Sequence, residues 1–169
     1  MTLLDGSLET RAPIAIIGCG NRCRSDDGVG GKVLDLLAAR GVGVDPSKVR
    51  LLDAGTDGVG VMFAARGCRR LIVVDACRTG ADPGAVFEVP GDELDDGEGP
   101  PLATHEFRWD HAIAAGRRIF RNDFPGDVTV FLIEAESVEF GSDLGPRATL
   151  AAAKVADRIA FLTAAEIAT

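Results

Sequence analysis

Residues 14–31 read IAIIGCGNRCRSDDGVGG, and this stretch decides the fold class. It opens with a short apolar run, residues 14–17, which is typical of a buried β-strand. It closes with a glycine-rich segment that leads into valines and leucines at helical spacing. The loop between them carries two adjacent carboxylates, Asp26 and Asp27. Because ligands of an open α/β sheet bind at the carboxyl ends of its strands, we expect this loop to carry part of a functional site.

The two carboxylates indicate which kind of ligand the loop suits. A phosphate-binding loop offers bare backbone amides and a Lys or Arg near the anion. Asp26 and Asp27 would instead repel phosphate and attract a cation. A structural alternative is that one of them caps the following helix by accepting backbone N–H bonds. That alternative leaves the other carboxylate unexplained.

Gly18 and Gly20 also begin a dinucleotide-binding pattern, G-x-G-x-x-G. The third glycine would stand at position 23, where this chain has Cys23. Asp53, at the end of the second predicted strand, would serve as the ribose acceptor. A nucleotide-binding oxidoreductase is therefore kept as an alternative. The acids in the loop argue against it, and we expect no nucleotide cofactor.

The composition fits one globular domain. The 169 residues are enough to bury a core without disulfides or a structural metal. A formal charge of −8 argues against nucleic acid and anionic membrane surfaces as partners. No apolar run has the length of a membrane span, and the first residues lack the apolar core of a signal peptide, so we expect a cytoplasmic protein. We expect a disordered tail at residues 1–12 and an exposed acidic loop at residues 91–104.

Strand and helix patterns alternate along the rest of the chain, which predicts a three-layer α/β/α sandwich. The continuous apolar run at residues 71–75 is typical of a parallel strand covered on both faces. The further predicted elements are strands at 49–53, 85–89 (antiparallel to the others) and 128–133, and helices at 28–40, 59–65, from after His105 to about Arg121, and at 148–162.

Carboxylates follow three of the predicted strands. Asp26 and Asp27 follow the first, Asp53 ends the second and Asp75 ends the third. If these strands are parallel neighbours, their carboxyl ends share one edge of the sheet. Structural alternatives stand beside the functional one: Asp53 also fits a turn with the Gly and Thr that follow it, and Asp75 fits a turn or a helix cap.

The histidines and cysteines are the remaining candidates for metal ligands. His105 follows an irregular loop, a position that suits a site, although both His105 and His111 are alternatively surface residues. Two carboxylates and one imidazole at the sheet edge would suit a divalent transition metal. Cys19 and Cys23 lack the paired C-x-x-C spacing of zinc sites, so we expect free thiols and keep a zinc site as the alternative.

Five short motifs occur in a distinctive order along the chain. They are Gly18-Cys19-Gly20-Asn21 with Asp26-Asp27-Gly28-Val29-Gly30, Asp53-Ala54-Gly55-Thr56, Ile72-Val73-Val74-Asp75-Ala76 with Asp82-Pro83-Gly84, the lone His105, and Glu136-Ser137-Val138-Glu139 with Leu144-Gly145-Pro146. This set resembles the nickel–iron hydrogenase maturation proteases. The resemblance spans residues 14–160, which is nearly the whole chain.

The resemblance implies a mixed, mostly parallel five-stranded sheet between helices. It also implies an endopeptidase that removes the C-terminal extension of the hydrogenase large-subunit precursor after nickel insertion. The metal-contacting trio of that family falls on Asp27, Asp75 and His105. Asp27 stands where some members have Glu, so its reach is one methylene shorter. The supporting loop residues are Asn21, Asp26, Asp53, Gly55 and Thr56.

The implied partner is the precursor itself, which would supply the nickel, and we expect the protease to be a monomer. The water that cleaves the peptide would be activated by a carboxylate, as in aspartic proteases, or by the metal. Asp27 and Asp75 are the catalytic candidates in both cases. A non-catalytic nickel-binding maturation chaperone is the alternative from a different class of protein.

Overall fold

The computed structural model describes residues 12–94 and 108–168 of the chain. Of the predicted tail, residues 1–12, only Ala12 falls within the described residues, and it is buried. The predicted acidic loop, residues 91–104, lies outside the described residues from position 95 onward. Its start is not a loose loop, because Gly91–Glu93 form a 3-10 turn and Gly91 is packed against Val128.

Five strands and four α-helices alternate along the described residues, and each lies where the sequence pattern predicted it. The strands are β1 (Ile14–Cys19), β2 (Val49–Gly55), β3 (Arg70–Cys77), β4 (Val86–Pro90) and β5 (Asp127–Glu134), and the helices are α1 (Val29–Ala39), α2 (Gly58–Ala65), α3 (Trp109–Phe120) and α4 (Pro146–Ile167). Helix α4 is longer than predicted because Pro146 fits its first turn and no later Gly or Pro interrupts it. No helix among the described residues combines the length and apolar character that a membrane span requires.

The strands form one sheet in the order β2-β1-β3-β5-β4. Neighbouring strands are parallel except for β4, which runs antiparallel to β5, so the mixed five-stranded sheet and the antiparallel strand are confirmed. Gly18 in β1 is paired with Asp53 of β2 and with Val74 of β3. The carboxyl ends of these three strands therefore meet at one edge of the sheet.

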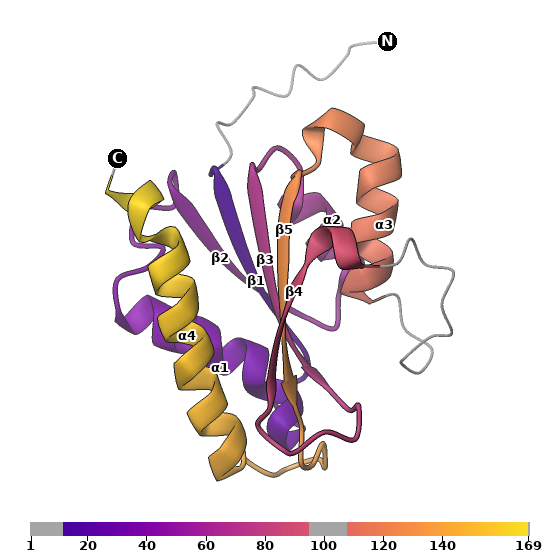
Figure 1. Ribbon diagram of the computed structural model, residues 1–169, viewed down its shortest axis with the longest axis vertical. Helices are drawn as coiled ribbons and strands as arrows, with labels where there is room; N and C mark the ends of the chain where they lie inside the picture. The colour runs from indigo at the N-terminus through magenta and orange to yellow at the C-terminus, as the bar shows by residue number, and fades with distance from the viewer. Residues whose placement is uncertain (1–11, 95–107, 169) are drawn as a thin grey trace.

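Both faces of the sheet are covered by helices, which explains why the central strands are apolar throughout (Figure 1). Helices α1 and α4 cover one face, where Ile16 and Ile72 are buried. Helices α2 and α3 cover the other face, where the alternate residues Ile17 and Val73 are buried. Successive side chains of a strand point to opposite faces, so a strand with two covered faces needs apolar residues at every position.

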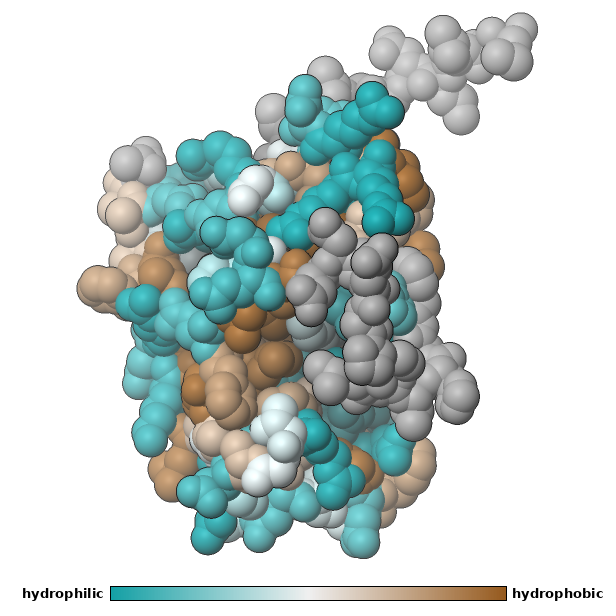
Figure 2. Space-filling view, turned by 45° about the vertical axis from the view of Figure 1, so that its right-hand side comes forward, coloured by the Kyte–Doolittle hydropathy of each residue, from teal (hydrophilic) through white to brown (hydrophobic). Residues whose placement is uncertain are grey.

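The strand β4 forms one edge of the sheet and is the least buried strand. It leaves Val86 and Phe87 partly exposed, and apolar surface is visible between polar side chains on the face shown in Figure 2. Glu88 in this strand forms a bidentate ion pair with Arg158 of α4, and Pro90 is the last residue of the strand. A charge and a proline are common devices that discourage an edge strand from pairing with another chain.

Two glycines bring the start of α1 against the ends of β1 and β3. A Cβ atom at Gly30 would lie 2.5 Å from the carbonyl oxygen of Cys19 and 2.7 Å from that of Val74. A Cβ atom at Gly18 would lie 2.7 Å from the carbonyl oxygen of Gly30. These neighbours are backbone atoms of packed strands and a helix, so moving them aside would cost considerable free energy. The glycines are needed for this close approach.

We expect Gly30→Ala to lower the free energy of unfolding by about 2 kcal/mol, because the added methyl group overpacks a rigid contact. Chemical denaturation of the purified protein measures this change. Gly126→Ala is the matched control, since a Cβ atom there meets nothing within 4 Å, and it should change stability by less than about 0.5 kcal/mol. Equal stability of the two variants would contradict the close contact.

A buried carboxylate ties the first loop to the loop after β5. Asp26 is only 3% exposed, and its Oδ2 accepts hydrogen bonds from the backbone nitrogens of Glu136 (2.8 Å) and Ser137 (3.4 Å). Its Oδ1 accepts from the backbone nitrogen of Gly145 at 2.8 Å. The alternative that Asp26 or Asp27 caps α1 is wrong, because Gly28 stands at the N-cap of this helix and no side chain bonds there. Asp26 satisfies backbone donors that lie more than a hundred residues away along the chain instead.

We expect Asp26→Asn to lower the free energy of unfolding by about 2 to 4 kcal/mol, because its amide group would turn a donor toward buried backbone N–H groups. Asp143→Asn, an exposed residue of the loop that Asp26 holds, should change it by less than about 0.5 kcal/mol. Denaturant unfolding followed by circular dichroism compares the two variants. A loss below 0.5 kcal/mol for Asp26→Asn would show that the carboxylate does not hold the loop.

Candidate active site at the ends of β1 and β3

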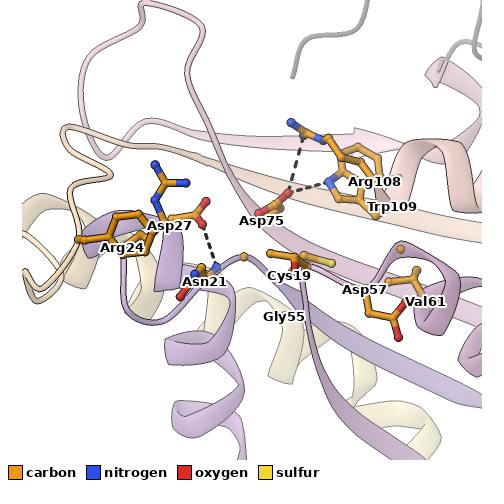
Figure 3. Close-up of a pocket in the computed structure, with 14 residues that line it drawn as sticks. Cys19, Asn21, Arg24, Asp27, Gly55, Asp57, Val61, Asp75, Arg108 and Trp109 are labelled. Atoms are coloured by element: carbon orange, nitrogen blue, oxygen red, sulfur yellow. Dashed lines mark hydrogen bonds and ion pairs between the residues drawn. The ribbon is translucent and has the colours of Figure 1, made fainter. Parts of the chain in front are cut away.

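A cavity of about 330 Å³ opens at the edge of the sheet where β1, β2 and β3 end (Figure 3). Its walls come from the loop after β1, the turn between β2 and α2, the end of β3 and the start of α3. Of the residues predicted for the site, it brings together five: Asn21, Asp27, Gly55, Thr56 and Asp75. The cavity therefore lies where the strand ends predicted it.

Asp27 enters the cavity from the short 3-10 turn that precedes α1. Its Oδ2 accepts a hydrogen bond of 2.8 Å from the backbone nitrogen of Asn21. The Asn21 side chain in turn accepts from the backbone nitrogen of Cys23 at 2.8 Å, which fixes the turn of the loop. Asp27 is half-buried, and its carboxylate points toward the same space as that of Asp75 (Figure 3).

Asp75 lies at the floor of the cavity and is only 8% exposed. Its Oδ2 accepts a 2.8 Å hydrogen bond from the indole nitrogen of Trp109, and its Oδ1 accepts one of 2.8 Å from the backbone nitrogen of Ala76. The guanidinium of Arg108 lies 3.7 Å from Oδ2. Asp75 is therefore a buried, oriented carboxylate, which a simple turn acid would not be.

Sequence reasoning missed Arg108 and Trp109 as site residues. A signal was present for Trp109, because the indole N–H of a buried tryptophan usually finds a polar partner. It also missed Asp57, which lines the cavity and caps α2 through a 2.9 Å bond from Gly60. Arg24 and Phe140 were missed too; they line the opposite side, with the Arg24 guanidinium carbon 4.6 Å from the Phe140 ring centroid.

Asp53 does not line the cavity, and its contacts are structural. Its Oδ1 accepts from the backbone nitrogen of Gly55 at 3.1 Å, which confirms the predicted turn. Its Oδ2 accepts a 2.6 Å bond from the side chain of Arg22, which also holds Asp35 at 2.7 Å. Asp53 is therefore held in a turn and an ion pair outside the cavity.

The cysteines are free thiols, as predicted. Cys19 is buried and lines the cavity, whereas Cys23 is exposed and lies outside it. Burial, together with the nearby carboxylate of Asp75, raises the pKa of the Cys19 thiol, which keeps it protonated at neutral pH. Residues 12–94 and 108–168 contain no group of three His, Cys, Asp or Glu side chains placed to hold a metal ion. Within these ranges, Cys19 and Cys23 are therefore not part of a metal-binding cluster.

The structure describes one of the two histidines. His105 lies outside the described residues. His111 is exposed on α3, in agreement with the interpretation as a surface residue.

Burial raises the pKa of Asp75 from 3.8 to about 6, because the desolvated carboxylate is disfavoured. The Arg108 guanidinium and the hydrogen bonds from Trp109 and Ala76 oppose this shift, and the charge of Asp27 adds to it. Asp75 therefore exchanges a proton close to neutral pH. A group of this kind is suited to general acid–base chemistry.

Because the pKa of Asp75 is higher in the folded protein, protonation stabilises the fold. That stabilisation is fully present below pH 3.8 and is lost as the pH rises through about 6. Between pH 4 and 7 we expect the wild type to lose about 2 kcal/mol relative to Asp75→Asn, measured by denaturant unfolding at each pH. Asp157→Asn, whose side chain is 72% exposed, should follow the wild type. Parallel curves for Asp75→Asn and the wild type would contradict the shift.

Comparison with known proteins bears on what such a cavity does. The sequence model of the HycI hydrogenase maturation protease family matches residues 33–161. The hydrogenase expression/formation protein HoxM of Azotobacter vinelandii is 30% identical over 137 residues, which are 80% of this chain and 64% of that protein. HupD of Thiocapsa roseopersicina is 28% identical over 136 residues, or 79% of this chain and 60% of HupD. The chain thus matches less than two thirds of the length of each relative.

Solved structures share the fold. The hydrogenase maturating endopeptidase HybD from E. coli superposes with a TM-score of 0.69 at 22% identity, over 86% of this chain and 88% of HybD. The maturation protease HycI from Thermococcus kodakarensis KOD1 superposes with a TM-score of 0.70 at 22% identity, over 93% and 94% of the two chains. Because the family model matches residues 33–161, which are most of this chain, the chain belongs to the HycI family of hydrogenase maturation proteases.

Proposed function

We propose that this chain is an endopeptidase that removes the C-terminal extension of a nickel–iron hydrogenase large-subunit precursor after nickel insertion. The observation that carries the proposal is the pair of carboxylates, Asp27 and Asp75, which line one cavity at the edge of the sheet. Membership of the maturation protease family supports the class of reaction. The family match begins at residue 33, so the role of Asp27 rests on its position in the cavity.

In this proposal, nickel is part of the substrate. The precursor carries the metal to the cavity, where Asp27 and Asp75 offer carboxylate oxygens. His105, which lies outside the described residues, is the candidate for an imidazole ligand. Carboxylate and imidazole ligands suit a divalent transition metal. Contact with the metal would hold the peptide beside it in one orientation, and such positioning alone can contribute several kcal/mol to lowering a reaction barrier.

The hydrolytic step needs a group that moves protons at the scissile bond. A water molecule attacks the peptide carbonyl and gives up a proton, and the amine that leaves takes up a proton. Asp75 fits the role of this base and then acid, because its pKa of about 6 lets it accept and release a proton near neutral pH. Asp27 has one oxygen held by Asn21 and its other oxygen available on the cavity side for the substrate metal or the water.

Asp27→Asn and Asp75→Asn should each slow processing by about 100-fold or more, because an amide can neither carry the charge nor take up the proton. The assay is intact-mass measurement of the large-subunit precursor from the same organism, incubated with each protein. The precursor is used both nickel-loaded and nickel-free. Asp157→Asn, an exposed residue of α4 that does not line the cavity, is the matched control and should process at the wild-type rate.

Loss of a C-terminal peptide from the loaded precursor alone would agree with a protease that depends on nickel. Full activity in both Asp→Asn variants would exclude these residues from the chemistry. Binding without cleavage by the wild type, in a preparation that a related protease does cut, would identify a non-catalytic maturation chaperone instead.

A further inference from the structure

Arg108 places a positive charge directly beside the buried carboxylate of the cavity. It stands at the N-cap of α3, and its Nη2 lies 3.7 Å from Oδ2 of Asp75. Its guanidinium carbon lies 6.0 Å from the centroid of the Trp109 ring. Figure 3 shows the guanidinium directly above Asp75. Arg108 thus occupies space that a cation approaching Asp75 would need.

The contact between Arg108 and Asp75 is not that of a structural ion pair. At 3.7 Å it is longer than a charge-assisted hydrogen bond, which is about 2.7 to 2.9 Å. The buried Nε of Arg108 has no hydrogen-bond partner among the described residues. Arg22, by contrast, donates bonds of 2.6 Å to Asp53 and 2.7 Å to Asp35. Arg108 therefore supplies a positive charge to the cavity, and no short hydrogen bond to Asp75 fixes the position of its guanidinium.

Asp75 does not need Arg108 to satisfy its hydrogen bonds. Trp109 donates to one carboxylate oxygen and the backbone of Ala76 to the other, each at 2.8 Å. What Arg108 adds is a charge that attracts the carboxylate and repels any second cation. In a partly buried site, where the effective dielectric constant is well below that of water, this repulsion of a divalent ion is strong.

We propose that Arg108 keeps free divalent metal ions away from Asp75, so that the cavity takes up nickel only when a precursor presents it. The biological meaning rests on the proposed protease function, but the exclusion of metal is a property of the free protein. The loose contact of Arg108 lets it swing aside when other contacts of the precursor bring the metal in. Arg108 is thus a specificity residue that distinguishes protein-bound nickel from free nickel.

The test is calorimetric titration of the full-length protein with Ni²⁺ alone, without any precursor. Arg108→Gln removes the charge and should bind Ni²⁺ at least tenfold more tightly than the wild type. Arg108→Lys keeps the charge and should bind as weakly as the wild type. Arg118→Gln, an exposed residue of the same helix, removes one positive charge away from the cavity and should have no effect. Thermal unfolding verifies that each variant is folded.

The double variant Arg108→Gln with Asp75→Asn locates the gained binding. It should lose the gain, because the carboxylate that the arginine guards is gone. The proposal is overturned if Arg108→Gln binds Ni²⁺ no more tightly than Arg108→Lys, or if the gain survives in the double variant. No precursor is cleaved in this experiment, so its outcome is independent of whether the chain is a protease.

Discussion

The contact between α1 and the ends of β1 and β3 is the constraint on which the site depends. At Gly30 the helix backbone lies against the carbonyl groups of Cys19 and Val74, with no room for a side chain. This contact fixes the start of the helix over two neighbouring strands. It places the turn that carries Asp27 beside the strand end that carries Asp75. A larger residue at this point would separate the two carboxylates, because backbone atoms on both sides cannot give way.

Two adjacent aspartates in the first loop have opposite tasks. Asp26 is buried and satisfies backbone amides of the loop after β5, so it holds the wall of the cavity in place. Asp27 turns toward the cavity and keeps part of its carboxylate accessible. One short 3-10 turn therefore both anchors the loop after β5, through Asp26, and presents the Asp27 carboxylate to the cavity. A rigid support of this kind keeps the Asp27 carboxylate in a fixed position at the cavity.

The electrostatics of the cavity follow from the burial of Asp75. Desolvation raises its pKa, and the positive charge of Arg108 with the N–H donors of Trp109 and Ala76 limits the rise. The result is a carboxylate that is ionised in most molecules at pH 7 and still close to its pKa. The same arginine that moderates the pKa also lines the cavity and gives it a positive charge. The pKa of Asp75 therefore depends on residues from both β3 and α3.

The sequence by itself determined the strands, the helices and the layer order, because each depends on apolar periodicity within a few residues. It also placed Asp27 and Asp75 at strand ends that share one edge, since parallel neighbours have their carboxyl ends on the same side. The motif order indicated the family, which the comparison confirmed.

Only the tertiary structure decided which of the two neighbouring carboxylates, Asp26 or Asp27, is buried and which lines the cavity. Asp26 and Asp27 are chemically identical neighbours, and their roles differ because residues more than a hundred positions away pack against one and not the other. Likewise, Arg108 and Trp109 reach Asp75 from 33 and 34 positions along the chain. No local pattern encodes such a contact, because it arises from the way α3 packs over the end of β3.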